Sequence, residues 1–341
     1  VDTHADLLRQ SAAVPGNDHR LGAHEAPPAI ISMFLGDQLE DVINQLCSTG
    51  AAIHSKSGGT VKTGVTTIVD FDQDTTDRNR TSPFAFTTNK FEFRMVGSSD
   101  SVSAANVVLN TIVAEAFKEA ADKLEAAEDF NMAVHDMIKE LFEKHRRIVF
   151  NGNGYTQEWV EEAERRGLPN LRCMVDAIPA LVTDKAIKLF TSFGVYTEAE
   201  LLARAVIEYE AYVKTINVEA RTMLDMAGKQ IVPAVIHYTT FMAQSVNTIQ
   251  KACAYADVSV QNDMLMEMSK LLGEMKAAMN ELEKHLEMAN NFKNMEQCAH
   301  YYYDMIVPAM NHLREPADKL EMLVDKTYWP FPSYGDMIFE V

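Results

Sequence analysis

The segment from Asn79 to Arg94 has residue types and a spacing suited to chemistry on charged substrates. It ends in KFEFR (90–94), where charged and aromatic residues alternate. Alternate side chains of a β-strand point to opposite faces, so the three charged side chains share one face and the two phenylalanines the other. A carboxylate between two cations is a poor core element and a good ligand for a metal ion that bridges phosphates. The alternative is an exposed edge strand with a salt-bridged outer face, which is the commoner meaning of so short a pattern.

A second charged segment lies upstream, at residues 17–28 (NDHRLGAHEAPP). Its glycine and prolines predict a loop, so we expect Arg20 and Glu25 on a segment that is neither helix nor central strand. Charged loops beside a rigid scaffold are where substrates are usually handled.

Taken together, the two segments resemble glutamine synthetase, specifically its large type III branch. Members of that branch carry an arginine loop of the RLGAxEAPP kind, followed by NRTSPFAFTxNKFEFR. The resemblance continues through GSSDSVSAANVVLNTIVAEAF (97–117), FNGNGY (150–155) and DKTYWPFPSYGDMIFEV (325–341). Two specific motifs in the family's order, with matching flanks, make a chance agreement improbable.

The resemblance implies an ATP-dependent ligase that joins glutamate and ammonium through a γ-glutamyl phosphate, with Mg²⁺ or Mn²⁺ as the metal. Such chemistry needs cations for the phosphates and for the substrate carboxylates, and a carboxylate that takes a proton from ammonium. By motif, Glu92 resembles the metal-binding glutamate near the γ-phosphate. Arg94 and Arg20 resemble the arginines that bind glutamate.

The remaining matches concern ATP and ammonium. Lys90 and Arg80 resemble the basic residues that contact ATP phosphates, and Arg80 the catalytic one at the transferring phosphoryl group. Glu25 resembles the flap glutamate that closes over the intermediate and helps to deprotonate ammonium.

Three positions depart from the family pattern. Ala85 stands where the smaller branches carry a second arginine, and His24 stands where asparagine is expected. Thr88 replaces an expected glycine, which matters if the turn requires a positive φ, because that conformation is costly for a β-branched residue. These departures bear on activity more than on family membership.

The chain opens with VDTHADLLRQSAA, which resembles the middle of the family's catalytic domain. Glutamine synthetases place a small β-grasp domain and most of their metal-binding carboxylates upstream of this point. We therefore expect the chain to be the C-terminal part of a longer enzyme and to be inactive alone.

Composition excludes several classes of protein. The chain has 341 residues, enough for about two domains, and its 47% hydrophobic and 23% charged residues are ordinary for a soluble globular protein. A net charge of −18 argues against nucleic-acid binding and against adhesion to anionic membranes. The 4 cysteines are far apart in the sequence, as expected for free thiols in a reducing compartment. With neither a long apolar run nor a signal peptide at its start, the chain is expected to be cytoplasmic.

The predicted fold class is α+β. Residues 1–128 are expected to form the C-terminal part of a catalytic domain, with antiparallel strands and helices. Within it, residues 28–46 have helix-compatible apolar spacing. From about Ser103 to about Leu323 the composition favours helix, so residues 129–323 are expected to form a helical domain, followed by a tail at 324–341.

Two long helices are predicted to pack as an antiparallel bundle or intramolecular coiled coil. A capping box at 197–200 (TEAE) starts the first helix. Apolar residues then recur at steps of four and three: Leu202, Val206, Tyr209, Val213, Ile216, Ala220 and Met223 in the first helix; Met264, Met268, Leu271, Met275, Ala278 and Leu282 in the second. Between them, Pro233 lies near the predicted start of a third helix.

Two alternatives remain open. The helical region favours an oligomerisation or interaction module that carries an inert catalytic remnant, and the type III resemblance implies a homo-oligomeric ring. The glycine-rich residues 151–154 suggest a phosphate loop, but the lack of a P-loop lysine favours a tight turn into a helix capped by Thr156.

Overall fold

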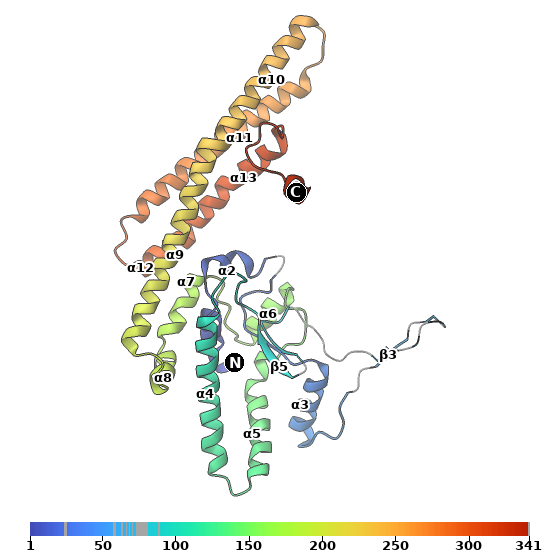
Figure 1. Ribbon diagram of the computed structural model, residues 1–341, viewed down its shortest axis with the longest axis vertical. Coiled ribbons are helices and arrows are strands. Elements are labelled where there is room, and N and C mark those ends of the chain that lie inside the picture. The colour runs from blue at the N-terminus through green and yellow to red at the C-terminus, as the bar shows by residue number, and fades with distance from the viewer. Residues whose placement is uncertain are drawn as a thin grey trace. The chain divides into compact units, whose positions relative to one another are not determined.

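The computed structural model describes residues 1–23, 26–56, 59–62, 64, 65, 67, 69, 71, 72, 81–87 and 89–339. In these residues the chain is mostly helical, with a small three-stranded mixed sheet (Figure 1). It divides into two compact units, Val1–Glu208 and Tyr209–Val341. Four residues singled out in the sequence lie outside the described residues: His24, Glu25, Arg80 and Thr88.

The three-stranded sheet of the first unit has the order β1-β4-β5. Its strands are β1 (Met33–Phe34), β4 (Phe84–Thr87) and β5 (Lys90–Phe93). Since β4 and β5 are antiparallel but β1 is parallel to β4, the prediction of antiparallel strands is right for the hairpin and wrong for β1. A parallel neighbour requires a long crossover, and the chain between Phe34 and Phe84 supplies it. A separate antiparallel pair joins β2 (Thr60–Val61) to β3 (Phe71–Asp72).

The predicted helix at 28–46 is wrong in its first part. Residues 33–34 form β1, and helix α3 covers Asp37–Thr49. Gly36 separates the two elements with a φ of 79°, a conformation that glycine adopts readily and a helix does not allow.

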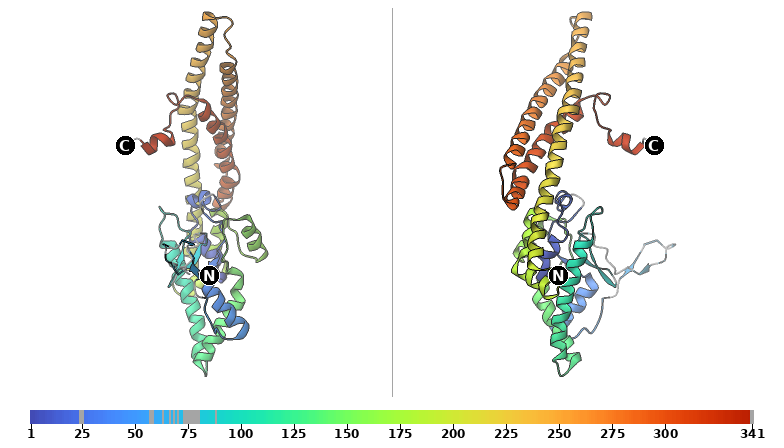
Figure 2. Two further views of the ribbon diagram at one scale, coloured as in Figure 1. Left: turned by 90° about the vertical axis from the view of Figure 1, so that its right-hand side faces the viewer. Right: turned by 60° about the vertical axis from the view of Figure 1, so that its left-hand side comes forward.

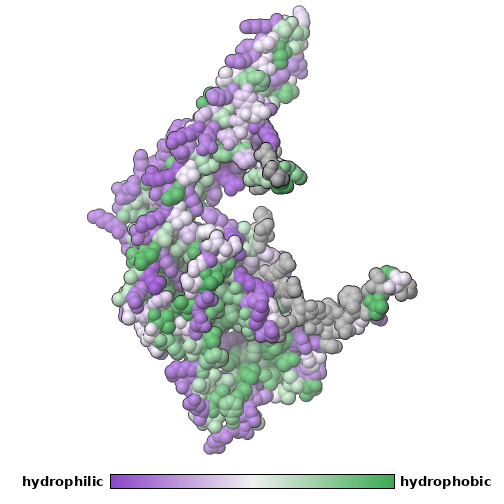
Figure 3. Space-filling model, in the orientation of Figure 1, coloured by the Kyte–Doolittle hydropathy of each residue, from purple (hydrophilic) through white to green (hydrophobic). Residues whose placement is uncertain are grey.

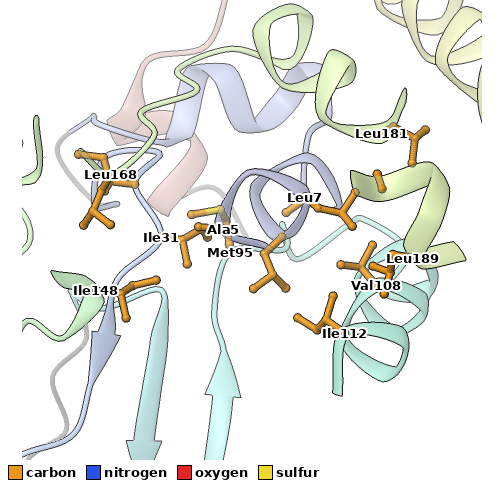
Figure 4. Packing of buried hydrophobic residues seen from close by; sticks show 14 of the residues in the cluster. Ala5, Leu7, Ile31, Met95, Val108, Ile112, Ile148, Leu168, Leu181 and Leu189 are labelled. Carbon is orange, nitrogen blue, oxygen red and sulfur yellow. The ribbon is translucent and has the colours of Figure 1, made fainter. Parts of the chain in front are cut away.

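Short and long helices surround a hydrophobic core in the first unit. They are η1 (Asp2–His4), α1 (Ala5–Gln10), α2 (Pro15–Arg20), α4 (Ser103–Glu125), α5 (Phe130–His145), η2 (Arg146–Ile148), α6 (Gln157–Arg165), α7 (Met174–Ala177), η3 (Ile178–Val182), α8 (Asp184–Ser192) and the beginning of α9 (Glu198–Met226). Helix α1 packs against α4, α7 and η3. Leu7, Ile112 and Leu189 bring side chains from α1, α4 and α8 into this core (Figure 4).

Met95 belongs to the same core cluster and is 1% exposed (Figure 4). It follows Arg94 directly, just beyond the end of β5. The core therefore anchors the end of the strand that carries the charged face.

The α4–α5 hairpin exposes large hydrophobic side chains, and Figure 3 shows hydrophobic residues gathered over this part of the visible face. We call the following set the hairpin patch: Val113, Phe117, Phe130, Met132 and Leu141. Such a grouping on a soluble protein commonly marks an interaction surface.

The second unit consists of the rest of α9 and η4 (Ala227–Ile231), α10 (Val232–Ala252), α11 (Ser259–Ala289), α12 (Met295–Tyr301), η5 (Tyr302–Ile306), α13 (Val307–Leu323) and α14 (Tyr334–Phe339). Helix α11 lies beside α10 and α13, as the views in Figures 1 and 2 agree. The limits predicted from composition are confirmed, because α4 begins at Ser103 and α13 ends at Leu323.

The predicted apolar spacing is confirmed in α11 and only partly in α9. In α11, Met268, Met275 and Leu282 are all fully buried. In α9 the prediction is wrong at its first two positions, because Leu202 is 49% and Val206 55% exposed. The neighbouring residues Leu201 and Ala205 are buried instead, at 0% and 6% exposure.

The π-helical turns η4 and η5 both end with isoleucine and are followed by Val-Pro-Ala, so the sequence Ile-Val-Pro-Ala recurs at 231–234 and 306–309. Proline has no N–H to give to the carbonyl four residues earlier, and a π-turn is one way for a helix to absorb this loss. The helix predicted to start near Pro233 is therefore continuous with α9 through η4.

Candidate active site

The charged side chains of β5 form one paired group. Arg94 donates from Nε and Nη2 to Oε2 of Glu92 at 3.0 and 2.9 Å. Lys90 Nζ lies 3.3 Å from Oε1 of the same carboxylate. Hydrogen bonds from Arg94, and then from Lys90, lower the pKa of Glu92, so this carboxylate is ionised at neutral pH. The three charges share a face, as the alternation predicts.

The opposite face of the hairpin is aromatic. The Phe91 ring centroid lies 5.6 Å from that of Phe84 and 5.2 Å from that of Phe86. Phe91 is 46% exposed, and β5 lies at the edge of the sheet formed by the described residues. These two features also fit the alternative of an edge strand with a salt-bridged outer face.

Arg20 is the last residue of α2, so the expectation that it lies outside a helix is wrong. The helix begins with Pro15 in its first turn, where the fixed φ of proline favours helix and its missing N–H costs nothing. After Arg20 the chain turns at Gly22, whose φ is 78°. The Gly22 amide donates to the carbonyl of Pro27 at 3.0 Å, which holds the two ends of this loop together.

Arg20 is bound to the backbone just beyond β5. Its Nη2 donates to the carbonyl oxygen of Met95 at 2.5 Å, and its Nε donates to Oδ1 of Asn17 at 2.9 Å. Asn17 is 1% exposed, and its Nδ2 donates to the carbonyls of Met95 and Ala12. These contacts bring Arg20, at the end of α2, close to the end of the strand that carries Glu92.

Asn17 was not among the predicted site residues. It precedes Arg20 by three positions, and side chains at this spacing on a helix are neighbours. The spacing in the sequence could therefore have indicated the contact between Asn17 and Arg20. A second buried pair, Arg9 and Asp18, had no such signal, because an isolated arginine and an isolated aspartate do not reveal that they meet.

The Arg9–Asp18 pair joins α1 to α2. Arg9 is 1% exposed, and its Nη2 lies 3.7 Å from Oδ1 of Asp18. Burial raises the pKa of Asp18 to about 7, although the Met174 amide and the charge of Arg9 oppose that shift. The Met174 amide donates to both carboxyl oxygens, at 2.8 and 3.0 Å.

The glycine-rich residues 151–154 contact the segment that follows β1 and the segment that precedes β4. Oδ1 of Asn151 accepts from the amides of Leu35 and Gly36, and Oγ1 of Thr81 accepts from the Gly154 amide at 2.8 Å. The predicted turn into a helix capped by Thr156 is confirmed, because Thr156 Oγ1 accepts a hydrogen bond from the Trp159 amide at the start of α6.

Ala85 is the cross-strand partner of Glu92, so the two side chains share a face of the hairpin. Ala85 is 1% exposed. The departure from the family pattern therefore lies directly beside the carboxylate that the sequence assigns to the metal.

Metal ligation and membrane insertion were searched for in the described residues. No group of three or more His, Cys, Asp or Glu side chains among them is arranged to hold a metal ion. Nor does any helix of that part of the chain combine the length and apolar character needed to span a bilayer.

Comparison with known proteins defines the class to which this fold and these motifs belong. A family model described as "Glutamine synthetase C-terminal domain" matches residues 133–250. Over almost its whole length the chain is similar to part of known glutamine synthetases.

Among individual relatives, the chain is similar to a "Type-3 glutamine synthetase" of Dictyostelium discoideum, at 38% identity over 99% of its own length. It is 37% identical to a "Glutamine synthetase" of Butyrivibrio fibrisolvens over 100% of its length, and 33% identical to one of Bacteroides fragilis over 99%. It spans 47%, 49% and 48% of the lengths of these three relatives, which is about half.

Proposed function

We propose that this chain supplies the glutamate- and phosphate-handling part of a cytoplasmic, ATP-dependent glutamate–ammonia ligase that forms glutamine through γ-glutamyl phosphate. The observation that carries the proposal is the hydrogen bond from Arg20 to Met95, which brings the arginine at the end of α2 to the end of β5, beside Glu92 and Arg94 in the sequence. The similarity to glutamine synthetases supports the same reaction.

In this proposal, Arg94 and Arg20 bind the substrate glutamate. Arg94 already holds the carboxylate of Glu92 through two nitrogen atoms. A planar guanidinium is well suited to bind carboxylates, and we assign Arg94 to a carboxylate of the substrate. Arg20 is fixed by Asn17 and Met95, so its charge is held in place before the substrate arrives.

Lys90 and Arg80 are proposed to contact ATP. Lys90 is 67% exposed at its side chain, so it can leave Glu92 and reach a phosphate at little cost. Arg80 precedes Thr81, whose hydroxyl accepts a hydrogen bond from Gly154. We assign Arg80 to the transferring phosphoryl group, where a fixed positive charge stabilises the transition state.

Glu92 is proposed as the ligand that this chain gives to Mg²⁺ or Mn²⁺, which would neutralise phosphate charge when bound. Its ionised carboxylate fits these hard cations, which prefer oxygen ligands. Glu25 is proposed to accept the proton of ammonium as the loop closes.

The test is a chimera in which this chain replaces the matching half of the Bacteroides fragilis relative. We expect γ-glutamyl hydroxamate formation by the chimera and none by the isolated chain. Arg94→Ala and Glu92→Gln in the chimera should each lower kcat/KM by about a hundredfold or more. Glu283→Gln, an exposed change on α11, is the matched control and should leave activity unchanged.

Two results would contradict the proposal. One is a chimera with the helix content and oligomeric mass of the relative but no activity. The other is full activity in the Arg94→Ala and Glu92→Gln variants. Activity of the isolated chain would instead show that the rest of the site is not needed.

The second candidate function is assembly, and the hairpin patch favours it. We propose a homo-oligomeric ring, in which residues 1–128 belong to the catalytic domain, 129–323 form a helical domain packed as an antiparallel bundle, and 324–341 form a tail. If assembly were the whole function, the charged face of β5 would be an inert remnant.

Light scattering on the chain tests the assembly role. Phe117→Glu places a charge on the hairpin patch and should lower the oligomeric mass while circular dichroism stays unchanged. Glu119→Gln, an exposed change on the same helix, should leave the mass unchanged. An unchanged mass in Phe117→Glu would remove the hairpin patch from the proposed assembly.

A further inference from the structure

The second unit contains a cavity of about 450 Å³ whose walls come from α9, η4, α13 and the segment that follows α13. Pockets that take small organic ligands commonly measure about 300 to 1,000 Å³ and are mostly apolar. Met223, Ile231, Leu313 and Phe331 are among its apolar wall residues. Its size and lining are therefore those of a small-molecule site, and none of its lining residues is assigned to the ligase reaction.

The wall that follows α13 is held in place by aromatic contacts. The Tyr328 ring lies 5.3 Å from that of Tyr238 and 5.9 Å from that of Phe241, both on α10, measured between centroids. The next residue, Trp329, lines the cavity and meets Phe331 edge-to-face at 6.2 Å. This part of the cavity is therefore preorganised, which lowers the entropic cost of binding.

One wall of the cavity coincides with an irregular turn of the helix. Ala227 and Ile231, the first and last residues of the π-turn η4, both line it. Single π-turns within α-helices are frequent at functional sites. This is an observation independent of the volume of the cavity.

The charged residues of the cavity lining indicate the sign of the charge that a ligand would carry. Three carboxylates (Glu219, Asp318 and Glu321) line the cavity together with one guanidinium, that of Arg314. Arg314 Nε donates to Asp318 Oδ2 at 3.1 Å, so its charge is largely balanced within α13. The lining is acidic, and the ring faces of tryptophan and phenylalanine also attract cations.

We propose that this cavity binds a small organic cation, an amine with an apolar body. The body would occupy the space between α9 and α13, and the ammonium group would lie near the acidic side chains. The inference is independent of the ligase proposal, because it shares no residue with it.

Calorimetric titration of the 341-residue chain with three probes of one shape tests the charge: cyclohexylbutylamine, cyclohexylbutanol and cyclohexylbutyrate. We expect the amine to bind about tenfold more tightly than the carboxylate, with the alcohol between them. The double variant Glu219→Gln/Glu321→Gln should reduce this preference several-fold. Glu315→Gln, a change on α13 outside the cavity lining, should not.

A pair of phenylalanine substitutions on α13 tests whether the amine binds in this cavity. Ala317 lines the cavity, so Ala317→Phe fills it and should abolish binding of the amine. Met322 is 84% exposed and outside the lining, so Met322→Phe should leave binding unchanged. Since the chain has 2 tryptophans, Trp159→Phe leaves Trp329 as the single fluorescent reporter, and the amine should change its emission.

Three outcomes would overturn the proposal. They are equal binding of the three probes, no binding of the amine, and amine binding that Ala317→Phe does not weaken. If Ala317→Phe does not fold, the double glutamine variant and the Trp329 emission decide the question, because neither change fills the cavity.

Discussion

Arg20 donates a hydrogen bond to the backbone carbonyl of Met95, which joins residues 75 positions apart in the sequence. A second hydrogen bond, from Arg20 to Asn17, fixes the plane of the guanidinium. Met95 is held by the hydrophobic core, and Asn17 is buried. The position of this arginine thus depends on the folding of the whole first unit, and Asn17 acts as a positioning residue for it.

Replacement of Asn17 tests this role. In the chimera, Asn17→Ala should raise the KM for glutamate by about tenfold and leave the KM for ATP nearly unchanged, because the substrate arginine loses its support. Losing the partner of buried carbonyls should also lower the free energy of unfolding by about 1–3 kcal/mol. Asn110→Ala, an exposed change on α4, is the control. A fall in kcat alone, with both KM values unchanged, would contradict the positioning role.

The sequence predicts local features of this site well, because they follow from short-range periodicity. The alternation of KFEFR places Glu92 and Arg94 on one face of β5, and the structure pairs them. Their meeting with Arg20 is a different matter, since it depends on the core that holds Met95. Only the family resemblance predicts that Arg20 shares a site with Glu92 and Arg94, and nothing in the spacing of the residues specifies it.

The error in α9 has a physical cause. The predicted stripe begins with Leu202, Val206 and Tyr209, and the buried one with Leu201, Ala205 and Tyr209, so both have a helical spacing and they share Tyr209. The choice between them depends on which face the rest of the protein covers. In α11 the rest of the protein covers the predicted stripe from Met268 to Leu282, and the prediction is right there.

A pH dependence follows from the pKa of Asp18, which burial raises from 3.8 to about 7. Between these values the native state binds more protons than the unfolded chain, so the free energy of unfolding falls as the pH rises from about 4 to about 7. Asp18→Asn cannot ionise, and it should make this fall smaller in urea unfolding followed from about pH 5 to about pH 8. Burial also raises the pKa of Glu208 to about 7, so part of the fall should remain until Glu208→Gln is added.

Asp336 supplies the control for this measurement. Hydrogen bonds from Lys326, and then from Ser333, lower its pKa to about 2. It is ionised in both states above about pH 5, so Asp336→Asn should change stability by the same amount at every pH in the range. A wild-type slope that persists undiminished in Asp18→Asn/Glu208→Gln would show that neither carboxyl is buried as the structure has it.

Gly154 and Gly273 should respond in opposite directions to alanine. A Cβ on Gly154 would lie 2.5 Å from the backbone oxygen of Thr81, so Gly154→Ala should displace the start of β4 and destabilise the protein by about 1–3 kcal/mol. Gly273 lies inside α11, where an added Cβ would have no heavy atom within 4 Å other than those of the adjacent helix backbone, and Gly273→Ala should stabilise the protein by about 0.5–1 kcal/mol. Urea unfolding measures the change in the free energy of unfolding for both variants. If Gly154→Ala left this free energy unchanged, the close approach of Gly154 to Thr81 would be wrong.

Two methionines of α11 separate packing from helix propensity in the second unit. Met275 is fully buried, and Met266 is 64% exposed on the same helix. Met275→Ala leaves a cavity and should lower the free energy of unfolding by about 2–5 kcal/mol. Met266→Ala removes a methionine side chain that is mostly exposed to water, and it should change the free energy of unfolding by less than about 0.5 kcal/mol. Equal losses in the two variants would show that α11 does not bury the stripe of Met268, Met275 and Leu282, because propensity alone treats the two sites alike.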